Sequence, residues 1–198
     1  MVVSISRGNS KLGAIPSVSL PACSTCRPDA PCYKTCYARR LAARRENVRT
    51  AYYNNMEILL SDPALYWLQV RAAASMVRWF RFHVSGDLVN AEYWTEVVNT
   101  ARQLPHTNFL IFTKRFEIVN DWLDAGGKIP RNLKVIFSNW FDWKCENPHK
   151  LPVCEVINDA DEAPKGWKVC GGSCTACACR GCGCWSLKKG ETIAIIKH

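Results

Sequence analysis

The sequence lacks an apolar run long enough to cross a membrane. A membrane-spanning helix needs about 18 or more consecutive apolar residues, and no such run occurs among the 198 residues. The opening stretch, MVVSISRGNSKLG, also lacks the apolar centre of a secretory signal peptide. We therefore expect a protein with no membrane contact, located in a cytoplasm, where cysteine thiols are mostly reduced.

The short motifs of familiar enzyme classes are missing as well. The sequence contains no GxSxG, no HExxH, no Walker loop and no dinucleotide-binding GxGxxG. Its four histidines are scattered along the chain, and no pairing of a nucleophile with a base is evident. Motifs alone therefore leave open whether the chain is an enzyme.

Cysteine is what the sequence has in excess. Twelve cysteines fall into three groups, within CSTCRPDAPCYKTC, CENPHKLPVC and CGGSCTACACRGCGCW. Four thiolates complete one zinc site or one [4Fe–4S] cluster, so twelve thiols suffice for three such sites. The candidate metal ligands are Cys23, Cys26, Cys32, Cys36, Cys145, Cys154, Cys170, Cys174, Cys177, Cys179, Cys182 and Cys184.

Metal binding is a better interpretation of these cysteines than disulfide bonding. A secreted disulfide scaffold is usually short, and its cysteines are spread through the chain. Here they are clustered, and two of the gaps are Cys-x-Cys, in which close neighbours rarely bridge because disulfide geometry is restrictive. CxxC turns bring two thiolates to one ion. For Cys145 and Cys154, a role as small buried apolar residues is the alternative.

The cysteine spacing favours iron–sulfur clusters over zinc. Zinc ribbons use two CxxC knuckles separated by a spacer, whereas the first group has one knuckle followed by Cx5Cx3C. Iron–sulfur proteins tolerate irregular cysteine loops. We predict two or three [4Fe–4S] clusters that serve electron transfer or redox chemistry, with zinc as the alternative metal.

The apolar pattern predicts a single α/β domain over residues 1–198. Strands are expected at 17–22, 79–87, 108–115, 132–140 and 191–198. Helices are expected at 37–61, 63–77, 89–104 and 116–127. Their alternation predicts parallel βαβ units, as an open parallel sheet or an incomplete (β/α) barrel. The segment 141–185 interrupts this rhythm, and we expect it to be a cysteine-rich excursion with cluster-binding loops.

Polar segments follow the expected strands at their carboxyl ends, where functional residues gather in α/β folds. These segments are SGD (85–87), TKR (113–115) and SNW (138–140). We expect them to meet the first cysteine loop on one rim, with Ser85, Gly86 and Asp87 binding a cofactor beside a cluster. For Asp87, a cap on the following helix is an equally good interpretation.

Several stretches resemble a family of bacteriophage and prophage proteins, the gene product 88 family. They are GNSKLGAIPSVSLPACSTC, CYKTCYA, RFHVSGD, IFTKR and the late CW, which together span most of the chain. The resemblance implies a phage or bacterial origin, a host cytoplasm, and iron–sulfur bound by cysteine, but no settled activity. It assigns cluster ligands at Cys26, Cys32, Cys36 and Cys184. Cys23, Cys145, Cys154 and the doubled Cys-x-Cys spacings look like additions that imply more than one cluster.

The expected fold also resembles the radical S-adenosylmethionine enzymes, which carry CxxxCxxC after the first strand and a small-residue acidic motif after the second. Cys32-x3-Cys36 and the segment 85–87 match those places, but Arg39 stands where the third cysteine belongs. The resemblance implies S-adenosylmethionine as a cofactor if one iron lacks a cysteine ligand. Four cysteines on every cluster would exclude that chemistry.

The charge of the chain predicts an acidic or phosphate-rich partner. The formal net charge is +9, and five arginines follow the first cysteine group within eleven residues. On a helix they would form a basic face that can dock nucleic acid; a solvated face with Glu46 and Glu57 as partial partners is the alternative. A redox partner protein is also expected. The five arginines are Arg39, Arg40, Arg44, Arg45 and Arg49.

Overall fold

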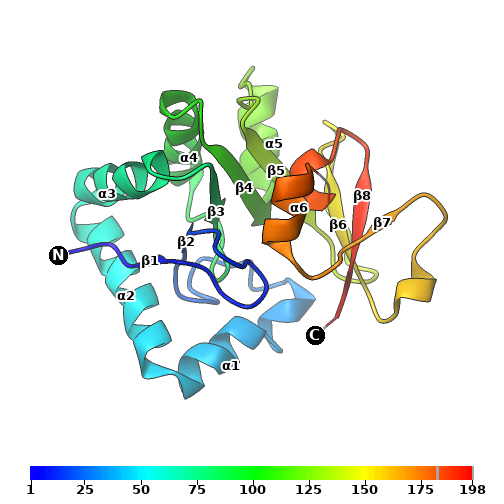
Figure 1. Ribbon diagram of the computed structural model, residues 1–198, viewed down its shortest axis with the longest axis horizontal. Coiled ribbons are helices and arrows are strands. Elements are labelled where there is room, and N and C mark those ends of the chain that lie inside the picture. Colours follow the sequence, from blue (N-terminus) through cyan, green and yellow to red (C-terminus); the bar gives the residue numbers. More distant parts are fainter. Residues whose placement is uncertain (182, 198) are drawn as a thin grey trace.

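A mostly parallel sheet forms the centre of the fold. The structure is a computed structural model that describes residues 1–181 and 183–197. Within these residues, eight strands pair into one open sheet in the order β1-β2-β3-β4-β5-β6-β8-β7 (Figure 1). Every neighbouring pair is parallel except β1 with β2. The predicted α/β class with an open parallel sheet is therefore confirmed. The strands are β1 (Ile5–Ser6), β2 (Ser17–Val18), β3 (Trp79–Phe82), β4 (Asn108–Thr113), β5 (Leu133–Ser138), β6 (Val153–Ile157), β7 (Lys168–Val169) and β8 (Thr192–Ile196).

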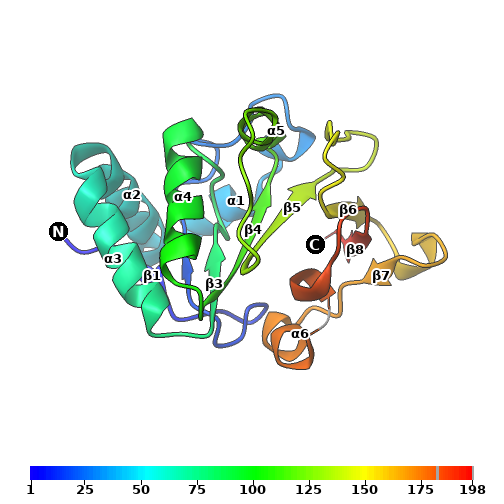
Figure 2. The same ribbon diagram turned by 90° about the horizontal axis from the view of Figure 1, so that it is seen from above.

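Helices lie on both sides of this sheet. Figure 2 shows α4 on one side of β3 and β4, and α6 on the opposite side. None of the helices in the described part of the chain combines the length and the apolar character that crossing a membrane requires. The helices are α1 (Tyr37–Arg44), α2 (Glu46–Ser61), α3 (Pro63–Ser75), α4 (Ala91–Gln103), α5 (Phe116–Asp124) and α6 (Cys174–Arg180), with short 3-10 turns η1 (Pro31–Tyr33), η2 (Ala160–Glu162) and η3 (Gly183–Ser186).

Alternate residues of the central strands pack into two separate cores, because successive side chains of a strand face opposite sides of the sheet. On β4, Phe109 and Ile111 pack into the large core that α2 to α5 cover. Leu110 packs on the other face with Cys154 and Cys184. The central strands are mostly apolar because both of their faces are largely buried. The cysteine-bearing face is therefore the one that the long helices leave uncovered.

The first predicted helix is wrong in one respect, because Arg45 divides 37–61 into α1 and α2. Arg45 has an extended backbone, with φ −129° and ψ 102°. Between Leu41 and Val48 the sequence has only alanine, polar and charged residues, so no apolar contact holds one straight helix there. Glu46 then starts α2 with a carboxylate in the first turn, where the helix dipole favours it.

The segment 141–185 is more regular than its composition predicts. It contributes β6, which lies between β5 and β8, as well as β7 and α6. The other predicted strands and helices are present, with ends shifted by a few residues. Strand β3 ends at Phe82 rather than at Gly86, because His83 adopts a left-handed backbone (φ 59°) and the chain turns away from the sheet.

Candidate metal centre

A cavity of about 510 Å³ lies at the carboxyl ends of the parallel strands. Its walls include residues from the loops after β2, β3, β4 and β5, and from β6 and β8. We call this cavity the thiol chamber, because eight of the eleven cysteines that the structure describes line it. These are Cys23, Cys26, Cys32, Cys36, Cys154, Cys170, Cys174 and Cys184.

The first four of these thiols lie on the loop between β2 and α1. Cys23 has a left-handed backbone (φ 67°), which is uncommon for a residue other than glycine. Its Sγ donates to the carbonyl oxygen of Tyr33 at 3.6 Å. Burial, together with the nearby carboxylate of Asp87, raises the pKa of the Cys26 thiol to about 12. A thiol in such surroundings ionises when a metal takes the place of its proton.

The other four thiols come from the opposite wall, on β6, after β7, at the start of α6 and in η3. Cys154 and Cys184 are buried. Burial raises the pKa of the Cys154 thiol to about 12. It also raises the pKa of the Cys184 thiol, to which the neighbouring thiols of Cys170 and Cys154 add. Cys154, Cys170, Cys174 and Cys184 all line the chamber, and they form its second cysteine set.

Asp87 connects the loop after β3 to the end of β4 through hydrogen bonds. Its buried carboxylate accepts hydrogen bonds from the Thr113 hydroxyl (2.6 Å), the Lys114 backbone N–H (2.8 Å) and the Leu88 backbone N–H (2.7 Å). The helix-cap interpretation is wrong, because the side chain of Asn90 caps α4 instead. The predicted rim is present: segment 85–87 and residues from 113–115 and 138–140 all line the chamber.

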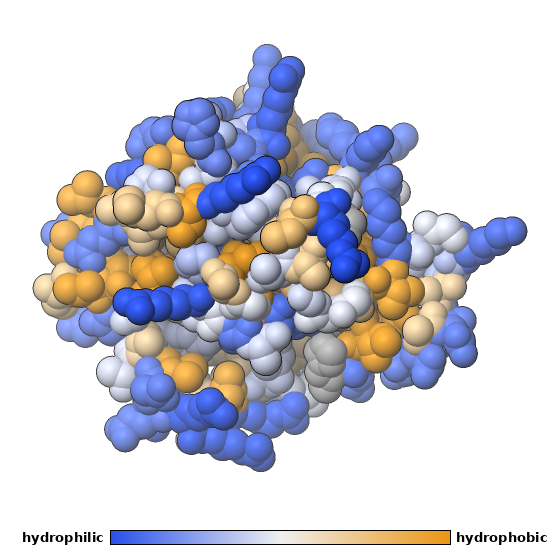
Figure 3. Space-filling view, in the orientation of Figure 1, coloured by the Kyte–Doolittle hydropathy of each residue, from blue (hydrophilic) through white to orange (hydrophobic). Residues whose placement is uncertain are grey.

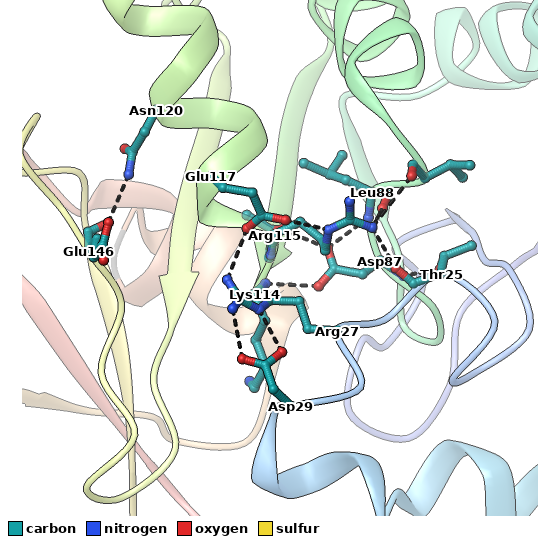
Figure 4. Close-up of polar contacts among 12 residues, drawn as sticks. Thr25, Arg27, Asp29, Asp87, Leu88, Lys114, Arg115, Glu117, Asn120 and Glu146 are labelled. Atoms are coloured by element: carbon teal, nitrogen blue, oxygen red, sulfur yellow. Dashed lines mark hydrogen bonds and ion pairs between the residues drawn. The ribbon is translucent and has the colours of Figure 1, made fainter.

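Ion pairs hold the first cysteine loop against α5 (Figure 4). The Arg27 guanidinium contacts Asp29 at 2.7 Å and Glu117 at 3.1 Å, and Arg115 contacts the same Glu117 at 2.6 Å. Arg115 also donates to the carbonyl oxygen of Thr25 at 3.3 Å. These contacts position the backbone beside Cys26, so the loop that carries the first set is braced from outside the chamber.

Basic side chains face the thiols inside the chamber. Arg81 donates to the Cys174 Sγ at 4.0 Å, and its guanidinium lies 4.8 Å from the centre of the Phe112 ring. Lys114 donates to the Ser138 hydroxyl at 2.6 Å. Positive charges near thiols favour the thiolate, the form that binds metal. The basic residues that line the chamber are Lys11, Arg27, Arg40, Arg81, Lys114 and Lys197.

Comparison with known proteins gives one match, to the model of a protein family. The model described as gene product 88 matches residues 4–188. The chain belongs to this family. No curated protein and no solved structure matches the chain. The resemblance noted from the sequence is confirmed, and the matched region of this family member includes both cysteine sets of the chamber.

The eight thiols of the chamber, with basic side chains beside them, are the donor type that a zinc site or an iron–sulfur cluster would use. Within residues 1–181 and 183–197, no three cysteine, histidine or acidic side chains lie close enough to hold one ion. Zinc needs four donors about 2.0–2.3 Å from one centre, whereas a cluster spreads its thiolates over several irons. Three residues of the chamber wall also carry buried polar atoms without a protein partner. These atoms are Arg81 Nε, His83 Nδ1 and Ser85 Oγ.

The remaining predicted ligands lie elsewhere. Cys145 packs against the large core, and its backbone N–H donates to Asn139 Oδ1 at 2.8 Å. Cys145 and Cys154 are consecutive cysteines in the sequence, but of the two only Cys154 lines the chamber. Cys177 and Cys179 lie on α6 and are not part of the chamber wall as the structure describes it. Cys182 lies outside the described residues.

Sequence reasoning missed the roles of Arg81 and His83. Both belong to WFRFH, a stretch that reads as one apolar strand. The signal was present, because a buried strand rarely carries an arginine without a partner for it. His83 is buried, its Nε2 lies 2.9 Å from the Tyr93 hydroxyl, and the residue is part of the chamber wall.

Proposed function

We propose that this chain binds two [4Fe–4S] clusters in the thiol chamber and serves electron transfer or redox chemistry. The first cluster is held by Cys23, Cys26, Cys32 and Cys36, and the second by Cys154, Cys170, Cys174 and Cys184. One observation carries the proposal: two distant segments of the chain each supply four thiols to one cavity. Three clusters, the upper end of the sequence prediction, would need further ligands from outside this cavity.

The surroundings of the thiols support a redox role. Two clusters that share one chamber are near neighbours, as an electron relay requires. Burial, nearby charges and hydrogen bonds to sulfur set the potential of a cluster, and the chamber supplies basic side chains and a hydrogen bond from Arg81 to the Cys174 Sγ. Strands β2 to β6 follow one another in the sheet, an order that an incomplete (β/α) barrel would also have.

Metal analysis of anaerobically purified protein tests the proposal. We expect about eight irons per chain, four for each cluster, with equal acid-labile sulfide and broad absorption near 400 nm. Cys32→Ala and Cys184→Ala should each lose about four irons. Cys179→Ala is the matched control and should lose none, because Cys179 is exposed on α6. A colourless protein with bound zinc would contradict the proposal and favour the alternative metal.

A second candidate is an enzyme that binds S-adenosylmethionine at an iron without a cysteine ligand. The hydrogen bond from the Cys23 thiol to the Tyr33 carbonyl favours it, because that thiol already has a protein partner. Cys26, Cys32 and Cys36 would then hold the first cluster. Of the predicted cofactor segment, Asp87 already accepts three hydrogen bonds, whereas the buried Ser85 hydroxyl has no protein partner.

Cys23→Ala separates the two candidates. If three cysteines hold the first cluster, this variant keeps its iron, and calorimetry shows S-adenosylmethionine binding that Ser85→Ala weakens. If the variant loses about four irons, Cys23 is a ligand. The enzyme hypothesis then fails for the first cluster.

A further inference from the structure

A basic projection follows the first cysteine loop. Helix α1 packs against α2 and runs along the lower edge of the molecule in Figure 1. Figure 3 shows hydrophilic atoms gathered at this edge, where α1 meets α2. Five arginines on this projection are exposed, and we call them the arginine prong: Arg39, Arg40, Arg44, Arg45 and Arg49.

Acidic side chains balance little of this charge. Glu46 pairs with Arg49 at 3.4 Å, an exposed contact that contributes little binding energy. Arg39 donates to the carbonyl oxygen of Lys34 at 3.3 Å. The side chains are arginines rather than lysines, and arginine forms paired hydrogen bonds to phosphate. The prong therefore fits a partner with repeated phosphates.

Aromatic side chains are exposed among the arginines. Tyr37 is 56% exposed and Tyr53 is 58% exposed, and Leu41 lies between them in the sequence with 38% exposed. Exposed aromatic rings beside basic residues are the features with which proteins bind single strands, since bases stack on the rings while phosphates contact the charges. An acidic protein partner would use the charges but would give these rings no stacking partner.

The prong also reaches the thiol chamber. Arg40 of the prong and the neighbouring Tyr37 both line the chamber, and the Tyr37 hydroxyl donates to the Val84 carbonyl at 2.8 Å. We infer that the arginine prong binds single-stranded nucleic acid and holds it at the mouth of the chamber. The binding follows from the surface alone. The functional role of this binding, in which a nucleic acid lies beside a redox centre, rests on the proposed function.

Fluorescence anisotropy with a labelled single-stranded oligonucleotide of about 20 nucleotides, as DNA and as RNA, tests this inference. The prong variant changes Arg39, Arg44, Arg45 and Arg49 to Gln and leaves Arg40 in the chamber wall. Each phosphate contact contributes about 0.7 to the slope of log affinity against log salt for single strands. We expect the prong variant to bind at least roughly tenfold more weakly at low salt, with a shallower slope.

A control variant removes the same charge from elsewhere. Changing Lys150, Lys165, Lys188 and Lys189 to Gln takes four positive charges from exposed positions in the C-terminal half. This variant should bind nearly as the unmodified protein does. Tyr53→Ala should weaken binding roughly fivefold or more, because base stacking on an aromatic ring contributes about 1–3 kcal/mol.

Three results would overturn the inference. The first is that the protein binds no oligonucleotide at low salt. The second is that the prong variant and the control variant lose the same amount of oligonucleotide affinity. The third is that the protein binds an acidic electron-carrier protein and no oligonucleotide. Iron content measured on the same samples distinguishes a failure of the cluster proposal from a failure of the prong inference. A protein without iron that still binds the oligonucleotide through the prong refutes the cluster proposal alone, and an iron-loaded protein that does not bind refutes the prong alone.

Discussion

Protonation of His83 should make the fold sensitive to acid in a calculable way. His83 is 4% exposed, and burial, with help from the charge of Arg81, lowers its pKa from 6.5 to about 3. The folded protein therefore holds this imidazole neutral down to about pH 3, whereas the unfolded chain takes up a proton below about pH 6.5. Stability is fully present above the unfolded pKa and falls as the pH drops from 6.5 towards 3.

The size of this effect follows from the two pKa values. Between pH 7.5 and pH 5.0, preferential protonation of the unfolded chain lowers the free energy of unfolding by about 2 kcal/mol. Other groups titrate over the same range, so the informative quantity is the difference between the protein and a His83→Asn variant. Asparagine tolerates the left-handed backbone at this position (φ 59°) and does not titrate.

Urea unfolding at the two pH values measures this difference. The variant should be less stable throughout, since it loses the contact with Tyr93, but its stability should fall by about 2 kcal/mol less on acidification. His106→Asn, at an exposed position, should keep the full dependence of the unmodified protein. An identical loss in the protein and in His83→Asn would refute the argument that His83 is held neutral.

Two further predictions concern single side chains. Asn55 is buried on α2 and makes three hydrogen bonds, to Ser4 N–H, Ser4 C=O and Ser19 C=O, so Asn55→Ala should lower the free energy of unfolding by about 3 kcal/mol. Asn47→Ala, at an exposed position of the same helix, should change it by less than about 0.5 kcal/mol in urea unfolding. Removing the charge beside Cys174 with Arg81→Met should make the reduction potential of one cluster more negative, and Arg81→Lys should restore part of the shift; potentials unchanged in both variants would contradict a tuning role.

Much of the sheet could be predicted from the sequence because its strands are unusually clear. FLIF is apolar at every position, and KVIF is apolar at every position except Lys134, since helices cover one face and the cysteine-bearing segments cover the other. Strand β6 gave no such signal, because VCEVI is short, follows a proline and contains a glutamate. Glu155 is tolerated there because Lys144 and Asn139 both contact its carboxylate.

The membership of the cysteine sets could not be predicted, because it depends on tertiary structure. Spacing grouped Cys145 with Cys154, yet a strand begins between them and only Cys154 faces the chamber. Asp87 shows the same limit. From the sequence, a carboxylate that follows a strand is interpreted as a helix cap or as a ligand. Only the tertiary structure brings the end of β4 to where Thr113 and Lys114 donate hydrogen bonds to the Asp87 carboxylate.

The central claim is that two clusters share one chamber. Electron paramagnetic resonance of the fully reduced protein tests it most directly, because two reduced clusters in one cavity interact magnetically. We predict a broad, interacting spectrum for the protein and a simple spectrum of one cluster for Cys184→Ala, with the same iron content per remaining cluster. A simple spectrum in the unmodified protein, unaltered by Cys184→Ala, would contradict the claim.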